Sequence, residues 1–385
     1  MMRYKLGEIF NLQMGKTPDR HSPKFWNEGT EPWISIADLT KCNKYIENTA
    51  EKITATAVDE SGIKIIPKNT VIMSFKLSIG KVAITPKKMY SNEAIMSFID
   101  KGVLKIEPVY LYYLLMHKDW DTGTNKAVMG KTLNKASLSQ MTVNIHGYSE
   151  QLEIIKALDA ASSIIVARKQ QLTELDNLIK ARFVELFGDP ISNPHGFDKV
   201  DLSELADIKI GPFGSLLHKE DYIEGGYALL NPSHIIDGKI APDSKLTVSR
   251  EKYEELSAYH LKAGDVVMGR RGEMGRCAVV PCDGYLCGTG SLLIRTKGDV
   301  TADYIQKIIS FPSFKKAIED MAVGQTMPNL NVPIVSRFQI IKPPIEIQHS
   351  YYAFVEQTDK SKVAVQKALD EAQLLFDSLM QKYFG

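Results

Sequence analysis

The feature that most constrains the fold is a repeat of long period, in which three stretches of the first half recur in the same order in the second. Residues 5–18 resemble 201–214, 65–84 resemble 260–279, and 130–138 resemble 324–332. Gly80 and Gly275 are 195 residues apart, Gly130 and Gly324 are 194 apart, and the aromatic–glycine pairs that end at 188 and 385 are 197 apart. Each match alone is weak, but ordered matches at a nearly constant spacing indicate a duplicated unit.

Each half begins with strand-like segments and continues into a helical one. Short β-branched runs bounded by Gly, Pro and Asn, such as 71–75 and 265–269, predict strands of a mixed sheet. Helical patterns at 109–117 and 304–311 interrupt them. The predicted class is therefore α+β, with two similar α/β domains in an internal pseudo-twofold repeat.

A long helix is predicted at the end of each half, because residues 149–187 contain neither Pro nor Gly. Apolar residues recur there every seven positions, at Leu158, Ile165, Leu172, Ile179 and Leu186. The positions 197 residues later are Val355, Lys362, Leu369, Phe376 and Tyr383, with Lys362 as the one polar exception. A heptad kept in both halves predicts that the two helices form an antiparallel coiled coil that separates the domains. The alternative is that each helix packs only on its own domain.

The clearest boundary is the Pro-, Gly- and Asn-rich segment 187–197, which follows the first helical stretch. The chain is also long enough for two ordinary domains. We expect a first domain at 1–148, a long helix at 149–188, a linker at 189–200, a second domain at 201–342 and a second long helix at 343–385.

Composition excludes some classes of protein. The 47 basic and 46 acidic residues leave a formal charge of +1, so the chain is not a polycationic DNA coat. We find no apolar run long enough to cross a membrane and no secretory signal, and we therefore expect a cytoplasmic protein. Cys277, Cys282 and Cys287 lie close together, with Cys42 and His260 elsewhere, but their spacing fits free thiols better than a zinc site.

Motifs for catalysis are missing. The sequence contains no GxxxxGK[ST] phosphate loop, and no GxGxxG follows a predicted strand. Asn231, Pro232, Ser233 and His234 resemble the start of the Asn-Pro-Pro-aromatic motif of amino-methyltransferases, but the second proline and the aromatic residue are absent. We expect a turn there, and no catalytic residue or bound metal in this chain.

Basic residues are segregated along the chain. Residues 61–92 contain six lysines and no acid, and the equivalent stretch of the second half places Arg270, Arg271 and Arg276 among glycines. Arginine on a tight turn can bind phosphate or the guanine edge bidentately. A second acid-free stretch at 124–139 corresponds to a polar one around Asn329. Both pairs of stretches are candidate DNA contacts, and ordinary solvated loops are the alternative.

In this order the motifs resemble a target recognition domain of the specificity subunits of Type I restriction–modification systems. The second half carries the resemblance best, in GPFGS (211–215), NPSH (231–234), GRRGEMG (269–275) and GQTMPNLN (324–331). The first half departs more, with GKTP in place of GPFGS. The expected DNA contacts are Lys16, Lys76, Lys81, Lys126, Lys131, Lys135, Ser215, His218, Lys219, Arg270, Arg271, Arg276, Gln325, Thr326 and Asn329.

The resemblance implies a reader of double-stranded DNA rather than an enzyme. Each domain of such a subunit reads one half of a split site, and the helices hold the domains apart and dock two methylation subunits. Those partners carry S-adenosylmethionine and methylate adenine N6, and motor–nuclease subunits that use ATP and Mg²⁺ can join; none of these cofactors is expected on this chain. The competing hypotheses are a methyltransferase or nuclease with its own reader domain, and a coiled-coil scaffold that does not bind DNA.

Overall fold

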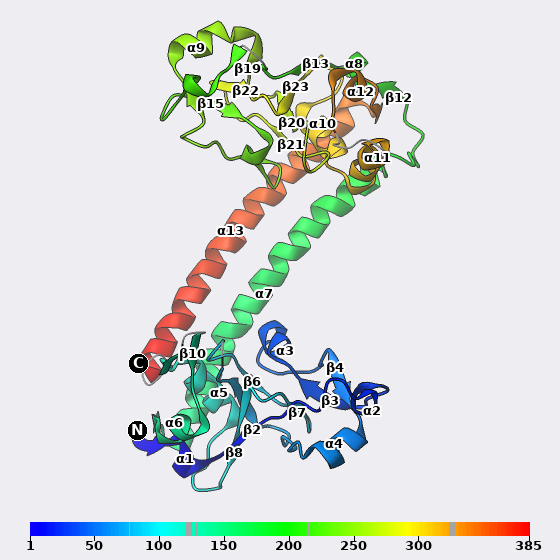
Figure 1. Cartoon of the computed structure of the whole chain (residues 1–385). Helices are drawn as coiled ribbons and strands as arrows, with labels where there is room; N and C mark the ends of the chain where they lie inside the picture. Colours follow the sequence, from blue (N-terminus) through cyan, green and yellow to red (C-terminus); the bar gives the residue numbers. More distant parts are fainter. Residues whose placement is uncertain (77, 121–124, 128–129, 214–215, 323–328) are drawn as a thin grey trace. The chain divides into compact units, whose positions relative to one another are not determined.

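The computed structural model describes residues 1–76, 78–120, 125–127, 130–213, 216–322 and 329–385. The chain divides into two compact units: Met1–Gln170 with Val365–Gly385, and Gln171–Ala364. Figure 1 draws both units with their element labels. None of the helices in these ranges is both long and apolar enough to cross a membrane.

Each unit is built on a four-stranded antiparallel sheet, and the two sheets have the same strand order. In the first unit the order is β2-β8-β5-β6, and in the second it is β13-β23-β20-β21. The strands of the first sheet are β2 (Phe10–Met14), β8 (Ile95–Asp100), β5 (Val71–Ser74) and β6 (Val82–Ile84). Those of the second are β13 (Ala206–Ile210), β23 (Ser291–Thr296), β20 (Val266–Gly269) and β21 (Cys277–Val279).

Smaller sheets repeat as well, and among the described strands each unit contains one parallel pair. In the first unit β3 (Glu31–Ile34) pairs in parallel with β7 (Tyr90–Ser91) and antiparallel with β4 (Glu51–Ile53). In the second, β15 (Tyr227–Leu230) pairs in parallel with β22 (Tyr285–Cys287), within a sheet that also holds β14 (Tyr222–Ile223), β18 (Thr247–Val248) and β19 (His260–Leu261). The predicted mixed α/β class and the repeat are thus confirmed.

The remaining described strands are paired in twos. They are β1 (Met2–Lys5) with β11 (Thr142–Ile145), β9 (Asn125–Ala127) with β10 (Gly130–Thr132), β12 (Lys199–Asp201) with β24 (Gln339–Ile341), and β16 (Ile235–Ile236) with β17 (Lys239–Ile240). The shorter helices of the first unit are α1 (Leu6–Ile9), α2 (Pro23–Trp26), α3 (Ile36–Lys41), α4 (Ala55–Ser61), α5 (Pro108–His117) and α6 (Lys135–Gln140). Those of the second are α8 (Leu202–Leu205), α9 (Arg250–Glu255), α10 (Ala302–Ile309), α11 (Pro312–Ala322) and α12 (Val332–Ser336).

Each four-stranded sheet is buried on both faces, which explains its continuous apolar runs. Along β5, Val71 and Met73 join one hydrophobic cluster, together with residues of α5, whereas Ile72 joins another. Along β20, Val266 and Met268 pack with α10, whereas Val267 lies in the second cluster of that unit. Alternate residues of a strand point to opposite faces, so a strand with two covered faces needs apolar residues throughout.

Buried polar residues tie each long helix to its unit in equivalent ways. Gln151 accepts a hydrogen bond from the backbone of Glu107 (3.0 Å) and is 1% exposed. Its counterpart Gln348, which is fully buried, accepts one from the backbone of Thr301 (3.0 Å) and donates one to the carbonyl of Pro343 (3.0 Å). Burial of an amide is tolerated when its polar atoms are paired, so both glutamines fix the start of a helix.

The two long helices are α7 (Tyr148–Phe187) and α13 (Ile345–Phe384), as the sequence predicts. Each begins in one unit and ends in the other, so both units contain a segment of both helices. In the second unit, Tyr351 of α13 packs its ring on Phe183 and Phe187, near the end of α7, whereas Lys362, further along α13, pairs with the earlier residue Asp176 (2.7 Å). The two segments are therefore antiparallel in that unit.

Candidate nucleic-acid interface

The motifs of the second unit converge at one end of its four-stranded sheet. The amide of Arg270, which follows β20, donates to the carbonyl of Gly290 (2.9 Å), and the carbonyl of Arg270 accepts from the amide of Leu330 (3.0 Å). The amide of Gly211 donates to the carbonyl of Ser291 (3.1 Å). Backbone bonds thus join the segments around 211, 270, 290 and 330 into one loop cluster, which we call the second loop cluster.

The first unit contains the same bonds at equivalent positions. The amide of Phe75 donates to the carbonyl of Ala94 (3.0 Å), the carbonyl of Phe75 accepts from the amide of Leu133 (3.1 Å), and the amide of Gly15 donates to the carbonyl of Ile95 (3.2 Å). We call the segments around 15, 75, 94 and 133 the first loop cluster. Phe75 is therefore the counterpart of Arg270, which supports the alignment of the residues that follow them.

A glycine is required where two of these segments touch. A Cβ atom at Gly211 would lie 1.9 Å from the carbonyl oxygen of Gly288, and one at Gly15 would lie 2.2 Å from that of Asn92. No side chain fits at such distances. This explains why glycine is common to the otherwise different motifs GPFGS and GKTP.

Arg270 has a structural role within the second loop cluster. Its side chain is partly buried, and its Nε donates to the carbonyl of Leu330 (3.0 Å). Burial and the neighbouring charge of Arg271 lower the pKa of Arg270. The guanidinium thus holds the segment that enters α12. This bond uses only Nε, so the other N–H groups of the guanidinium can donate to a further partner.

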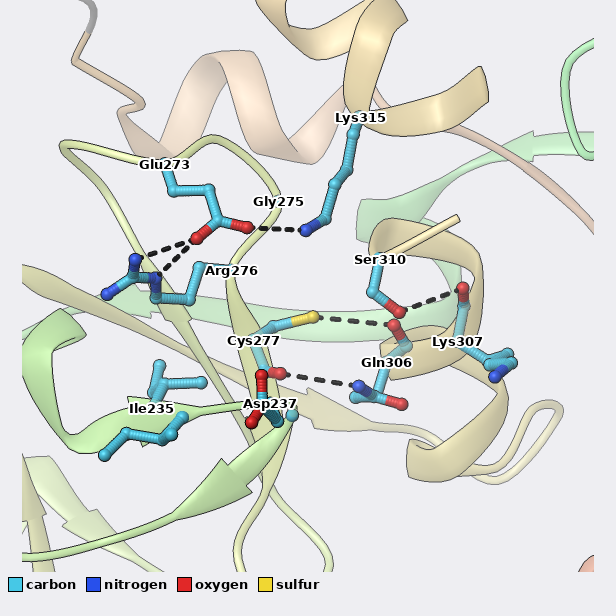
Figure 2. Close-up of a pocket in the computed structure, with 12 residues that line it drawn as sticks. Ile235, Asp237, Glu273, Gly275, Arg276, Cys277, Gln306, Lys307, Ser310 and Lys315 are labelled. Carbon is cyan, nitrogen blue, oxygen red and sulfur yellow. Dashed lines mark hydrogen bonds and ion pairs between the residues drawn. The ribbon is translucent and has the colours of Figure 1, made fainter. Parts of the chain in front are cut away.

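Arg276 is held by an acidic neighbour from the same turn. Its guanidinium donates to Oε2 of Glu273 (2.8 and 3.1 Å) and to the carbonyl of Pro232 (3.3 Å). Lys315 of α11 pairs with the other oxygen of Glu273 (2.8 Å). Figure 2 shows Glu273 between the two cations, at the edge of a pocket of about 440 Å³. The hydrogen bonds from Lys315 and Arg276 lower the pKa of Glu273, so it is ionised at neutral pH.

Three other predicted cations lie on the equivalent turns. Arg271 is exposed, whereas Lys76 and Lys81 are half-buried. The Lys76 ammonium lies over the ring of Phe75, and that of Lys81 donates to the hydroxyl of Thr40 on α3 (2.6 Å). Arg271 and Lys76 each directly follow the residue that anchors the cluster, so both are presented from a fixed backbone.

The first loop cluster also contains a cationic pocket. Lys16 and Lys135, two of the predicted residues, line a pocket of about 440 Å³ together with Lys64 and Glu93. All four side chains are exposed. Lys64 belongs to the acid-free stretch of the sequence but is not among the predicted contacts, and neither is Glu93. An exposed acid carries no sequence signal of its own, so Glu93 became visible only when the loops were brought together.

For five other predicted DNA contacts the structure describes no side chain. Ser215, Gln325 and Thr326 lie outside the described residues, and Lys126 and Lys131 are described by their backbones alone, in the hairpin of β9 and β10.

Asn329, His218 and Lys219 have described side chains. Asn329 lies within the second loop cluster, and its Oδ1 is buried without a hydrogen-bond partner among the described residues. His218 and Lys219 are exposed at the start of the 3-10 helix Lys219–Asp221, just before β14, and within the described ranges no hydrogen bond or ion pair joins their side chains to the cluster.

The cysteines are free thiols in the structure. Cys277 and Cys287 are buried, and burial raises the pKa of each to about 12, whereas Cys282 is exposed. Across the described part of the chain, no three Cys, His, Asp or Glu side chains are grouped as metal ligands.

The residues of the predicted seam differ in how deeply they are buried. Leu158 and Ile165 are buried, and the other predicted seam residues are half-buried: Leu172, Ile179, Leu186, Val355, Leu369, Phe376 and Tyr383. On α13 the more deeply buried series is Tyr351, Thr358, Val365 and Ala372, which is also spaced by seven. The two series together give the alternating three- and four-residue spacing of a coiled-coil seam.

The chain is similar to known proteins over nearly its whole length. The family model described as "Type I restriction modification DNA specificity domain" matches twice, at residues 1–177 and 194–372. The MjaIX specificity subunit of a Type I restriction enzyme from Methanocaldococcus jannaschii is 24% identical, over 98% of this chain and 91% of that protein.

Solved structures share the fold across the whole chain. The S subunit of a Type I restriction–modification system from M. genitalium has a TM-score of 0.56 at 14% identity, covering 100% of this chain and 96% of that one. A chain from a study of "complex assembly" and "conformational transition of the type I R-M system" has a TM-score of 0.63 at 15% identity, covering 100% and 97%.

Proposed function

This chain belongs to the Type I restriction modification DNA specificity family, and we propose that it reads a bipartite site in double-stranded DNA, one half with each loop cluster. The function named for the family is recognition of DNA rather than catalysis. The proposal assigns the first half-site to the domain at 1–148 and the second to the domain at 201–342, with helices at 149–188 and 343–385 and a linker at 189–200.

The observation that carries the proposal is that the two loop clusters share a backbone and differ in side chains. Equivalent backbone bonds position Phe75 and Arg270, and the residues that follow them are Lys76 and Arg271. Lysine offers a point charge for phosphate, whereas arginine can also donate two hydrogen bonds to the O6 and N7 atoms of guanine. Two domains that read different half-sites in the same way need the same backbone geometry and different side chains at the positions that contact DNA.

The proposal includes partners and their cofactors. Two methylation subunits would dock on α7 and α13 and transfer a methyl group from S-adenosylmethionine to adenine N6, and motor–nuclease subunits would supply ATP- and Mg²⁺-dependent cleavage in the cytoplasm. Exposed apolar side chains of α13 support docking there: Val363 is 71% exposed and Leu374 is 72% exposed, and their spacing of eleven residues, about three helical turns, places both on one face of the helix. Apolar surface that gathers on one exposed face is typical of a partner surface.

An exchange of domains tests the proposal. Replacing residues 1–148 by the same segment of a relative with another target should change one half of the recognised site and leave the other half unchanged. The measurement is the set of methylated adenines in the DNA of cells that express the chain with its methylation subunits. A change in both halves, or wild-type methylation without any preferred sequence, would contradict the proposed function.

A further inference from the structure

Glu93 lies in the first loop cluster, on the short loop between β7 and β8. The amide of Asn92 donates to the carbonyl of Ile34 (3.0 Å), and the side chain of Asn92 accepts from the amide of Ala94 (3.0 Å). The carbonyl of Ala94 in turn accepts from the amide of Phe75. The backbone is thus held on both sides of Glu93, which presents its carboxylate from a rigid position.

Several lysines line the same pocket as this carboxylate without forming an ion pair with it. Lys16, Lys64 and Lys135 line the same pocket as Glu93, yet within the described ranges none of them forms an ion pair with it. The hydroxyl of Thr17 donates to Oε2 of Glu93, and the backbone amide of Glu93 also interacts with this carboxylate; within the described ranges no other side chain donates a hydrogen bond to it. The carboxylate is exposed and therefore keeps lone pairs for a ligand.

Glu273, in the second loop cluster, gives the contrasting case. Its Oε2 accepts from Arg276 and its Oε1 from Lys315, so both oxygens are occupied within the protein. Glu273 binds two cations of the protein itself, whereas the carboxylate of Glu93 can still accept a hydrogen bond from a ligand. The two acids consequently have different roles, although both lie among cations.

A free carboxylate on a DNA-binding surface is unfavourable unless it binds a donor on the DNA, because every phosphate repels it. The hydrogen bonds from Thr17 and from the backbone amide of Glu93, together with the charges of Lys76 and Arg20, lower the pKa of Glu93, so at neutral pH the side chain accepts hydrogen bonds and cannot donate them. The major groove offers two amino donors to such a group, N4 of cytosine and N6 of adenine. Guanine O6 and N7 and thymine O4 are acceptors, which a carboxylate rejects.

We propose that Glu93 is a specificity-determining residue, whose exposed carboxylate accepts a hydrogen bond from the exocyclic amino group of a cytosine or an adenine in the first half-site. The inference rests on the proposed function and deepens it. The lysines of the pocket bind the flanking phosphates and offset the repulsion between those phosphates and Glu93. The equivalent place in the second unit is held by Thr289, an exposed hydroxyl that can donate as well as accept, so the two half-sites are read differently at this point.

The test uses two variants of Glu93 and one matched control, each assembled with the methylation subunits. Glu93→Gln keeps the shape and removes the charge, and Glu93→Ala removes both. Asp100→Asn removes one charge at the opposite end of β8, and its Oδ1 can still accept the hydrogen bond from the amide of Gly102. The recognised motif is read from the methylated adenines, and binding is measured on duplexes that differ from the native site at one base pair.

The decisive duplexes carry a base that lacks the amino group. At the base pair that responds to Glu93→Gln, adenine is replaced by purine, or cytosine by 2-pyrimidinone, and these two replacements tell which base is read. Wild-type protein should lose roughly tenfold in affinity on the replacement duplex. Glu93→Ala should bind the native and replacement duplexes equally, whereas Asp100→Asn should behave as wild type.

The outcomes separate this inference from the function on which it rests. Relaxed preference at one base pair of the first half-site, with the second half-site unchanged, supports the role of Glu93, and the intact second half-site also shows that the variant is folded and assembled. A uniform rise in affinity without any change in preference would overturn it, since Glu93 would then only repel DNA. A wild-type complex with no preferred sequence would instead overturn the proposed function, and this inference with it.

Discussion

Removing the charge of Glu273 should release two cations for DNA. In Glu273→Gln the shape of the side chain remains, but Arg276 and Lys315 lose the carboxylate that holds them (2.8 Å to each). The three side chains are 49%, 36% and 29% exposed. Pairs this exposed contribute about 0–1 kcal/mol to folding, so the free energy of unfolding should fall by no more than that.

The effect on DNA binding should be larger. If one released cation contacts a phosphate, the slope of log K against log salt steepens by about 0.9, which corresponds to roughly fivefold tighter binding at 0.15 M salt. The gain should be the same on specific and unrelated duplexes, because a phosphate contact carries no sequence information. Binding of the assembled complex across a salt series measures both quantities.

Asp237 provides the matched control, because it lines the same pocket, as Figure 2 shows, and has no ion pair among the described residues. Its backbone has a positive φ of 49°, which asparagine also adopts readily, so Asp237→Asn removes one charge without strain. It should change the salt slope far less than Glu273→Gln does. Equal slopes for the two variants would refute the reasoning, because the effect would then be general charge rather than released cations.

Three further predictions follow from single residues. Gln348→Ala should lower the free energy of unfolding by about 2–4 kcal/mol in urea titrations, because it leaves one buried and one part-buried backbone group unpaired; a change under 1 kcal/mol would mean that water replaces the amide. Arg271→Ala should cost about 1–3 kcal/mol on the native site and relax one base pair of the second half-site, whereas Arg270→Ala should mainly reduce stability; binding to single-base variants, with thermal unfolding, separates the two. Val363→Asp should prevent co-purification with the methylation subunits without unfolding the chain, whereas Gln357→Asp should not; assembly of both variants would exclude this face of α13 as the docking surface.

The long helices and the repeat could be predicted from the sequence because they depend on regular spacing. A heptad and a constant offset of motifs both survive when individual residues differ. The seam was predicted only in part, because Thr358 and Ala372 occupy the more deeply buried series of α13. A polar and a small residue at these positions hide the three–four alternation, although both are buried.

The details of the site could be predicted only where local sequence determines them. The glycine-rich turns and their cations were visible, and the structure places them in the loop clusters. The sequence did not show which cations are held in ion pairs within the protein. Arg276 and Lys315 both pair with Glu273, although Lys315 is 39 residues further along the chain than Arg276. Glu93 and Lys64 meet Lys16 only through the fold, so no spacing in the sequence could have joined them.

The repeat also explains how the target can change while the fold does not. The equivalent amides of Phe75 and Arg270 make the same hydrogen bond to the loop that carries Glu93 in one unit and Thr289 in the other. These bonds use backbone atoms, so they put no condition on the side chains that they position. The buried strands below them are constrained, because a strand covered on both faces admits apolar residues almost alone. Substitutions at the exposed tips of the loops should therefore cost little stability, and under the proposed function each half-site could change independently of the other.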